Sequence, residues 1–373
     1  MLFMTPALAE MDAAVLDEIE TMREQLRLWL RQPRRWRAQL RRNLKARAVR
    51  GSNNIEGYQV TLDDAVAMME DQEPLDADRQ TALEITGYRN ALTYIQQLAG
   101  DPHFTLDETL VRGLHFMMLG HDLGKRPGQY RLGPIYVHDD ENEVIAYEGP
   151  AAEQVPALMA ELVSDLGVPG EGSVYVRAAM AHLNLVMIHP FKDGNGRMAR
   201  ALQSLVLSRD GILAPEFSSI EEWLGRNTQG YYDVLALTGA GAWHPERDAS
   251  EWVRFNLRAH HMQAQTVLRR VDDAARTWAG LEQRIAGRGL PERSLHALYA
   301  AAMGLQVRRP VYEKDAEVEA ATAARDLRGL VAAGWLVARG ETRGRYYVAS
   351  PELREIRRAV VGERIALVDP YHR

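Results

Sequence analysis

The 373-residue chain has 46% hydrophobic and 26% charged residues, a composition typical of a folded globular protein. Its net charge of −6 argues against a generally polybasic nucleic-acid binder, and the lack of cysteine excludes disulfides, thiol catalysis and cysteine-ligated zinc. The length predicts two or three packed units. Residues 1–10 are apolar without a basic region before them, and no apolar run reaches bilayer length. We therefore expect a cytoplasmic protein without a signal peptide or membrane contact.

Apolar residues at helical spacing predict a mainly α-helical protein. One helix is expected over residues 11–50. Its basic stretch from Arg31 to Arg50 fits a solvated face, or else a nucleic-acid or membrane contact. We expect Gly51 to end this helix and a short helix to begin at Ser52. Further helices are predicted near 61–69, 77–98, 107–119, 151–166, 173–188, 197–208, 219–225, 228–238 and 248–280.

Two short stretches favour β-structure instead. Residues 134–138 and 144–147 are β-prone runs on either side of an acidic turn, which predicts a small hairpin within the helical protein. Residues 281–350 resemble a separate domain, in which two helices precede strands at 335–339 and 346–349. Helices followed by such a hairpin predict a winged-helix shape.

The segment from His189 to Arg200 has a backbone suited to binding an anion. Pro190 ends the preceding helix because proline cannot continue its hydrogen-bond ladder. Gly194 and Gly196 allow a left-handed backbone and the close approach of a ligand. Because a helix begins directly after them, free N–H groups and the helix dipole would face a bound phosphate.

The side chains of this segment add the chemistry of nucleotidyl transfer. Arg197 and Arg200 are three residues apart on one helical face, so both can reach one polyphosphate. Asp193 offers a carboxylate to Mg²⁺, which prefers one or two carboxylates together with substrate phosphates. His189 can remove a proton near neutral pH.

These residues also resemble the signature of the Fic family, His-x-Phe-x-Asp/Glu-Gly-Asn-Gly-Arg-x-x-Arg, at every fixed position. The resemblance implies transfer of AMP from ATP to a Ser, Thr or Tyr hydroxyl of a protein, with pyrophosphate leaving. It implies these roles: His189 as base, Phe191 as core anchor, Asp193 as Mg²⁺ ligand, Gly194, Asn195 and Gly196 as cradle of the α- and β-phosphates, Arg197 at the β-phosphate and Arg200 at the γ-phosphate.

The predicted hairpin, residues 132–148, is similar to the flap of this family, which adds a strand to the target peptide and places its hydroxyl over the base. The flap residues singled out are Ile135, Tyr136, Val137, Val144 and Tyr147. Tyr231 and Tyr232 resemble the region near the nucleotide base, although core packing accounts for either tyrosine equally well.

A second pattern resembles the inhibitory motif of the family, Ser/Thr-x-x-x-Glu-Gly/Asn. It is formed by Ser52, Glu56 and Gly57. The resemblance implies that Glu56 pairs with Arg200, so that ATP binds with its α-phosphate misaligned for attack. Alternatively, Glu56 is an exposed acid favoured by a helix dipole.

The resemblance therefore implies a Fic-type helical bundle with a β-hairpin flap and a C-terminal winged-helix domain. We divide the chain into residues 1–100 with the inhibitory helix, the catalytic core 101–260, a helical linker 261–285, and residues 286–373. DNA binding by the last part has weak electrostatic support, because acids are interspersed among its arginines. A protein-docking or packing role is an equal alternative.

The leading hypothesis is an autoinhibited protein adenylyltransferase that uses ATP and Mg²⁺ and also modifies itself. The alternatives are removal of AMP from a modified protein, use of another nucleotide or phosphocholine-bearing donor, and a DNA-binding regulator that responds to nucleotide. The sequence leaves open the target, the signal that relieves inhibition, and whether the chain forms a homodimer.

Overall fold

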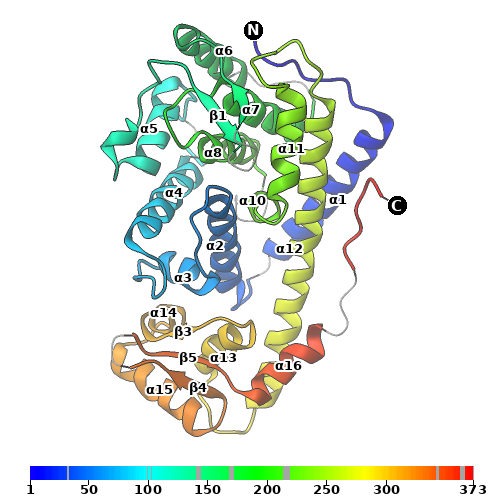
Figure 1. Ribbon diagram of the computed structural model, residues 1–373. Coiled ribbons are helices and arrows are strands. Elements are labelled where there is room, and N and C mark those ends of the chain that lie inside the picture. The colour runs from blue at the N-terminus through cyan, green and yellow to red at the C-terminus, as the bar shows by residue number, and fades with distance from the viewer. Residues whose placement is uncertain are drawn as a thin grey trace.

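The computed structural model is mainly helical, as predicted (Figure 1). It describes residues 1–372 except 32, 99, 102, 140–143, 168–171, 213–218, 342–343 and 362–365. The longest helix, α12 (Ser250–Ile285), has 36 residues and is therefore about 54 Å long. It runs along the larger helical part and ends at the smaller C-terminal part (Figure 1). Within the described residues, no helix combines the length and apolarity needed to cross a membrane.

The larger part is built around two antiparallel helices, α7 (Val174–Ile188) and α8 (Asn195–Arg209), which are buried along most of their length. Both helices are surrounded by others, and α8 therefore buries polar side chains such as Arg197, Arg200 and Gln203 together with its apolar residues. The surrounding helices are α1 (Glu10–Arg31), α2 (Arg37–Ile55), α3 (Leu62–Met68), α4 (Arg79–Leu98), α5 (Glu108–Leu119), α6 (Val155–Gly167), α10 (Glu221–Leu224) and α11 (Thr228–Gly239).

The single helix predicted over residues 11–50 is wrong. The chain forms α1 and α2 separately, with Pro33 in the break, where it cannot donate a backbone hydrogen bond. Gly51 does not end a helix either, because α2 continues to Ile55. A Cβ atom on Gly51 would lie 2.3 Å from the carbonyl oxygen of Glu221, and one on Gly225 would lie 2.8 Å from Cα of Gly51. The glycine therefore permits the close crossing of α2 and α10.

The predicted hairpin is present. Strand β1 (Tyr136–Asp139) pairs antiparallel with β2 (Val144–Glu148), with Tyr136 opposite Glu148 and a bulge between Val137 and His138. The acidic turn at residues 140–143 lies outside the described residues. The base of the hairpin is fixed to the helices, because the Tyr147 hydroxyl donates to the carbonyl of Met187 at 2.8 Å.

The C-terminal part has the predicted order of helices followed by a hairpin, with additional elements. Strand β5 (Tyr346–Ala349) lies between β3 (Val307–Arg308) and β4 (Leu336–Arg339). The strands pack with α13 (Leu295–Ala302), α14 (Arg309–Asp315) and α15 (Ala320–Ala332), and α16 (Pro351–Val361) follows. The winged-helix assignment and DNA binding remain predictions. Domain boundaries also remain predictions, and α12 is continuous across the one placed at residue 260.

Buried polar side chains link α7, α8, α11 and α12. The amide oxygen of Gln203 lies 2.6 Å from Nδ1 of His182, so this nitrogen carries the proton and Nε2 accepts from the Tyr231 hydroxyl at 2.9 Å. The amide nitrogen of Gln203 lies 3.2 Å from Nε2 of His260. Burial lowers the pKa of His182 and of His260 to about 3, so both rings are neutral and their hydrogen bonds hold the four helices in register.

We predict that these histidines make stability fall on acidification. Their pKa values in the folded chain lie below the ordinary 6.5, so the unfolded chain binds more protons between pH 6.5 and 3. Each would cost about 2 kcal/mol at pH 5 relative to pH 7. Urea unfolding of His182→Gln should show lower stability at pH 7 but a smaller loss between pH 7 and 5. An unchanged loss would contradict this account.

Candidate active site

The loop between α7 and α8 is shaped by three backbone features. His189 caps α7 with a left-handed backbone at φ 50°, and Pro190 follows it. Gly194 begins α8, also left-handed, at φ 76°. The backbone angle favours glycine, and a Cβ atom there would lie 2.9 Å from Cδ1 of Leu119, whose side chain would have to shift. The loop therefore leads directly into the N-terminus of α8.

Side chains inside the loop hold this shape. Phe191 is fully buried and stacks on His115 with ring centroids 3.7 Å apart. The side chain of Asn195 accepts from the Phe191 amide and donates to its carbonyl, each at 2.9 Å. Asn195 therefore closes the loop with its side chain and has only its backbone to offer an anion.

The ring of His189 is held in the tautomer that can accept a proton at Nε2. Its Nδ1 lies 3.1 Å from the carbonyl of Val186, which can only accept, so Nδ1 is protonated and the lone pair of the neutral ring is on Nε2. Burial lowers the pKa of His189 to about 4, which keeps the ring neutral at pH 7. Arg131 donates from Nε to the carbonyl of His189 at 2.9 Å and fixes this residue from outside the motif.

Arg200 lies in the second turn of α8, and its side chain contacts Ser52 and Glu56 of the predicted inhibitory motif. Its side chain is 1% exposed and donates to the hydroxyl of Ser52 at 2.7 Å and to the carboxylate of Glu56 at 2.6 Å. Burial alone would lower the pKa of Arg200, but the charge of Glu56 outweighs it and the pKa is raised. Among the described residues, Nη1 of Arg200 is a buried donor without a partner.

Glu56 occupies the space directly over the first turn of α8. A Cβ atom on Gly196 would lie 2.6 Å from the Glu56 carboxylate and 3.2 Å from Nη1 of Arg200. Gly57 is left-handed at φ 85°, and the amides of Gly57 and Tyr58 donate to carbonyls in the last turn of α2. This turn, which requires glycine, ends α2 so that Glu56 faces α8.

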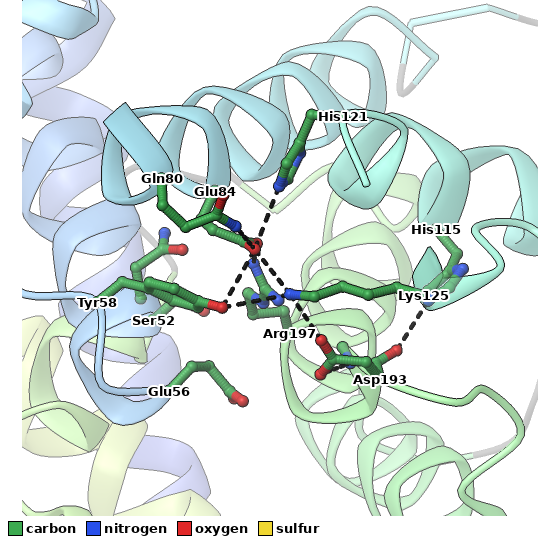
Figure 2. A network of polar contacts seen from close by, with 12 residues as sticks. Ser52, Glu56, Tyr58, Gln80, Glu84, His115, His121, Lys125, Asp193 and Arg197 are labelled. Carbon is green, nitrogen blue, oxygen red and sulfur yellow. Dashed lines mark hydrogen bonds and ion pairs between the residues drawn. The ribbon is translucent and has the colours of Figure 1, made fainter. Parts of the chain in front are cut away.

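Glu84 on α4 is the centre of a second polar network (Figure 2). Its carboxylate is fully buried and accepts from Arg197, from Lys125 at 2.8 Å, from Gln80 at 2.9 Å and from Tyr58 at 3.1 Å. Burial alone would raise the pKa of Glu84, but these donors, Lys125 and Arg197 above all, lower it to about 2. Arg197, also 1% exposed, is thus oriented by a buried charge.

Asp193 is linked to the same network. Its Oδ2 lies 2.8 Å from Nζ of Lys125, and its Oδ1 accepts from the Gly194 amide at 2.6 Å. Burial alone would raise the pKa of Asp193, but Lys125 outweighs it and the pKa is lowered. In the described part of the chain, no group of three His, Asp or Glu side chains could hold a metal ion. Asp193 can therefore offer one carboxylate, which suits Mg²⁺ only where phosphates supply further oxygens.

The tyrosines and the flap residues lie in different environments. Tyr231 is buried in the core, whereas Tyr232 is 45% exposed and donates to the carbonyl of Ile55 at 3.1 Å. Tyr136 and Ile145 are exposed on the flap at 41% and 54%, and Tyr147 is a buried anchor. Ile135 and Val137 are half-buried, and the side chain of Val144 is outside the described residues.

Several residues at the site were not found from the sequence, among them Glu84, Lys125, His115 and Arg131. Glu84 had a usable signal, because it is a carboxylate in the apolar stripe of α4 formed by Ile85, Tyr88 and Leu92. A charge at such a position is rarely buried without a partner. Lys125, from the short helix η1 (Leu123–Lys125), had no such signal, because only the packing of η1 brings it to Asp193.

The fold and the loop define a helical domain in which a helix N-terminus suited to bind an anion lies beside a neutral histidine. Residues 105–207 match the family model "Fic/DOC family", so this segment is similar to the domains of that family. A Fic family protein from Desulfovibrio desulfuricans G20 is similar in structure, with a TM-score of 0.59 and 20% identity over 93% of this chain and 98% of that one. Fic-1 (residues 134–508) from C. elegans has a TM-score of 0.54 and 22% identity over 69% of this chain and 71% of that one.

Among curated proteins, the chain is similar to proteins named "Protein adenylyltransferase Fic". The one from Nematostella vectensis is 30% identical over 169 residues, which is 43% of this chain and 37% of that protein. The one from Drosophila mojavensis is 29% identical over 211 residues, which is 55% of this chain and 37% of that protein. The matches thus span little more than a third of the length of these relatives.

We predict that Glu84→Gln strongly destabilises the protein. The substitution removes the charge but leaves Arg197 buried beside it, and breaking such a pair costs about 3–5 kcal/mol. The measurement is the free energy of unfolding in urea at pH 7. The control is Glu251→Gln, which breaks a pair with Arg254 at a carboxylate that is 58% exposed and should cost less than about 1 kcal/mol. Equal losses in both variants would contradict the assigned role of Glu84.

Proposed function

We propose that the chain is an autoinhibited protein adenylyltransferase, which transfers AMP from ATP to a Ser, Thr or Tyr hydroxyl of a protein, including itself. The names of the curated relatives and the Fic/DOC domain support the reaction class. The observation that carries the proposal is the carboxylate of Glu56 on Arg200, 2.6 Å away, over the N-terminus of α8. An acidic group there takes the place that a phosphate of ATP would need.

The phosphate site is supported by donors that gather at the start of α8. The first turn of α8 offers backbone amides and the positive end of a helix dipole. Arg200 adds a buried donor without a partner among the described residues, and Arg197 adds a second guanidinium held by Glu84. A polyphosphate would pair with guanidinium groups that are only 1% exposed, where charge interactions are stronger than in water.

The transfer itself needs a base and a leaving group. The target hydroxyl would give its proton to Nε2 of His189, and its oxygen would form a bond to the α-phosphorus. The bond from the α-phosphorus to the oxygen that bridges to the β-phosphate would break. Arg197 and Arg200 would bind the leaving pyrophosphate and stabilise its charge. When bound through Asp193, Mg²⁺ would neutralise phosphate charge and stabilise the leaving pyrophosphate.

The flap would place the target. Its two strands pair with each other, and among the described residues their further strand contact is a bridge from Glu148 to Ala242. The backbone edge of β1 is therefore suited to add an extended peptide. The exposed Tyr136 and Ile145 would contact the side chains of that peptide.

In this proposal, inhibition is a competition between two anions for Arg200. While Glu56 is paired, the γ-phosphate cannot reach the guanidinium, so ATP would bind with its α-phosphate out of line with the target hydroxyl. A displacement of about 1 Å at the reacting atoms can reduce a rate by about 100-fold.

We predict that Glu56→Gly raises self-modification by about 100-fold, because it removes the anion that competes with ATP. The measurement is incorporation of label from ATP labelled at the α-phosphate, with intact mass showing the addition of AMP. Glu56→Gly combined with His189→Ala should incorporate none, because the base is missing.

The matched control is Glu108→Gly, which removes a carboxylate that accepts from Tyr130 on the other side of the loop and should leave labelling at the wild-type level. Equal labelling of the wild type and Glu56→Gly would remove inhibition from the account. If Glu56→Gly binds ATP in calorimetry but adds no mass to any protein of a lysate, the transfer reaction itself is rejected.

A further inference from the structure

Helix α2, which ends at Glu56, belongs to both hydrophobic cores of the molecule. Ala46, Val49 and Ile55 pack into the core that surrounds α7 and α8. Leu40 and Leu44, from the first half of the same helix, pack into the core of the C-terminal part. In Figure 1, α2 lies within the larger part and its lower end faces the C-terminal part, so one helix reaches from the C-terminal part to the candidate active site.

The first half of α2 is bound to the C-terminal part by a buried ion pair. Both terminal nitrogens of Arg42 donate to the carboxylate of Asp315 at the end of α14, at 2.8 and 2.7 Å. The two side chains are only 10% and 7% exposed. Gln39 donates to the same carboxylate at 2.8 Å and to the carbonyl of His296 at 3.0 Å. These paired, shielded contacts fix the position of the helix along its axis.

The chain after Glu56 is bound to the same part. On α3, Asp64 is 1% exposed and pairs with Arg308 of β3 at 2.7 Å, and Asp63 accepts from the backbone amide of Gln306 at 2.7 Å. Arg308 also donates to the carbonyl of Glu73 at 2.7 Å. The turn that carries Glu56 is therefore held on both sides by α14 and β3.

These contacts also explain the basic stretch of α2. Its arginines were expected to face solvent or a nucleic acid, but Arg42 is paired as described and Arg47 lies 3.5 Å from the carboxylate of Glu222. Acidic residues of the C-terminal part, which argue against DNA binding by their charge, also form ion pairs within the protein. Asp315 holds Arg42, and Asp326 holds Arg293.

We propose that the C-terminal part, residues 286–349, regulates the candidate active site by holding α2 and α3, and with them Glu56, against Arg200. This inference rests on the proposed function and names its regulation. A ligand or partner that moves this part away from α2 would release Glu56, because a helix held at one end by Arg42 transmits the shift to its other end. The two states would differ in the contacts at α14 and β3, as coupling between sites requires.

The test weakens the contact on the C-terminal part, far along α2 from Arg200. Asp315→Ala should increase labelling from α-labelled ATP by about 5-fold or more over the wild type, the lower end of coupling between sites, and not beyond the level of Glu56→Gly. The double variant with Glu56→Gly should label as Glu56→Gly alone, because Asp315 acts through Glu56. Labelling of the double variant well above Glu56→Gly would overturn the proposal.

The matched control is Glu292→Ala. Glu292, in the C-terminal part, pairs with Arg35 just before α2. The side chains of Arg35 and Glu292 are 56% and 66% exposed, so this pair is not shielded from water. Labelling should stay at the wild-type level, because exposed pairs contribute little. If labelling rose equally in Glu292→Ala, any disturbance of this interface would raise labelling, and the specific role assigned to the pair of Arg42 and Asp315 would be rejected.

A second measurement does not depend on the reaction. Amide hydrogen exchange of residues 50–58 in the folded protein should be faster in Asp315→Ala than in the wild type, and unchanged in Glu292→Ala. If Asp315→Ala does not fold, Asp315→Asn takes its place, because it keeps the size of the side chain and removes its charge.

The outcomes separate the two proposals. Strong labelling of Glu56→Gly with wild-type labelling of Asp315→Ala overturns the regulatory proposal and leaves the proposed function intact. If Glu56→Gly does not label, the proposed function fails, and the exchange experiment decides alone. Faster exchange at residues 50–58 then supports the hold on Glu56, and unchanged exchange overturns it.

Discussion

The buried guanidinium of Arg200 needs a negative charge beside the N-terminus of α8, and this requirement organises the molecule around it. The glycines of the loop, the helix dipole and the buried guanidinium of Arg200 together make a site that is costly to leave without negative charge. In this structure the carboxylate of Glu56 supplies that charge. The close crossing of α2 and α10 at Gly51 and the glycine turn after Glu56 both place this one carboxylate.

The charges at the site form two balanced groups. Arg200 is paired with Glu56, while Arg197 and Lys125 are paired with Glu84 and Asp193. The first pair joins two helices through a partly exposed carboxylate, and the second group is centred on a fully buried one. In the proposed mechanism, the group centred on the fully buried Glu84 would maintain the geometry of the loop, and the pair of Arg200 with the partly exposed Glu56 would be the one that opens.

The hairpin, most helices and the site loop could be predicted from local patterns, because proline, glycine and apolar spacing act on neighbouring residues. The errors arose where a local signal had a distant cause. Gly51 was expected to end a helix, whereas it is small because α10 crosses there. The basic stretch of α2 was expected at the surface, whereas Arg42 is paired with Asp315, 273 residues away in the chain.

The sequence by itself determined the residues from His189 to Arg200 and the pattern from Ser52 to Gly57, since each is a short run whose spacing carries its chemistry. Only the tertiary structure decided which charges meet. Glu84, Lys125 and Arg131 come from separate elements and are brought to the loop by helix packing. Likewise, α2 joins two hydrophobic cores. Such pairings depend on contacts between distant segments, which residue spacing does not encode.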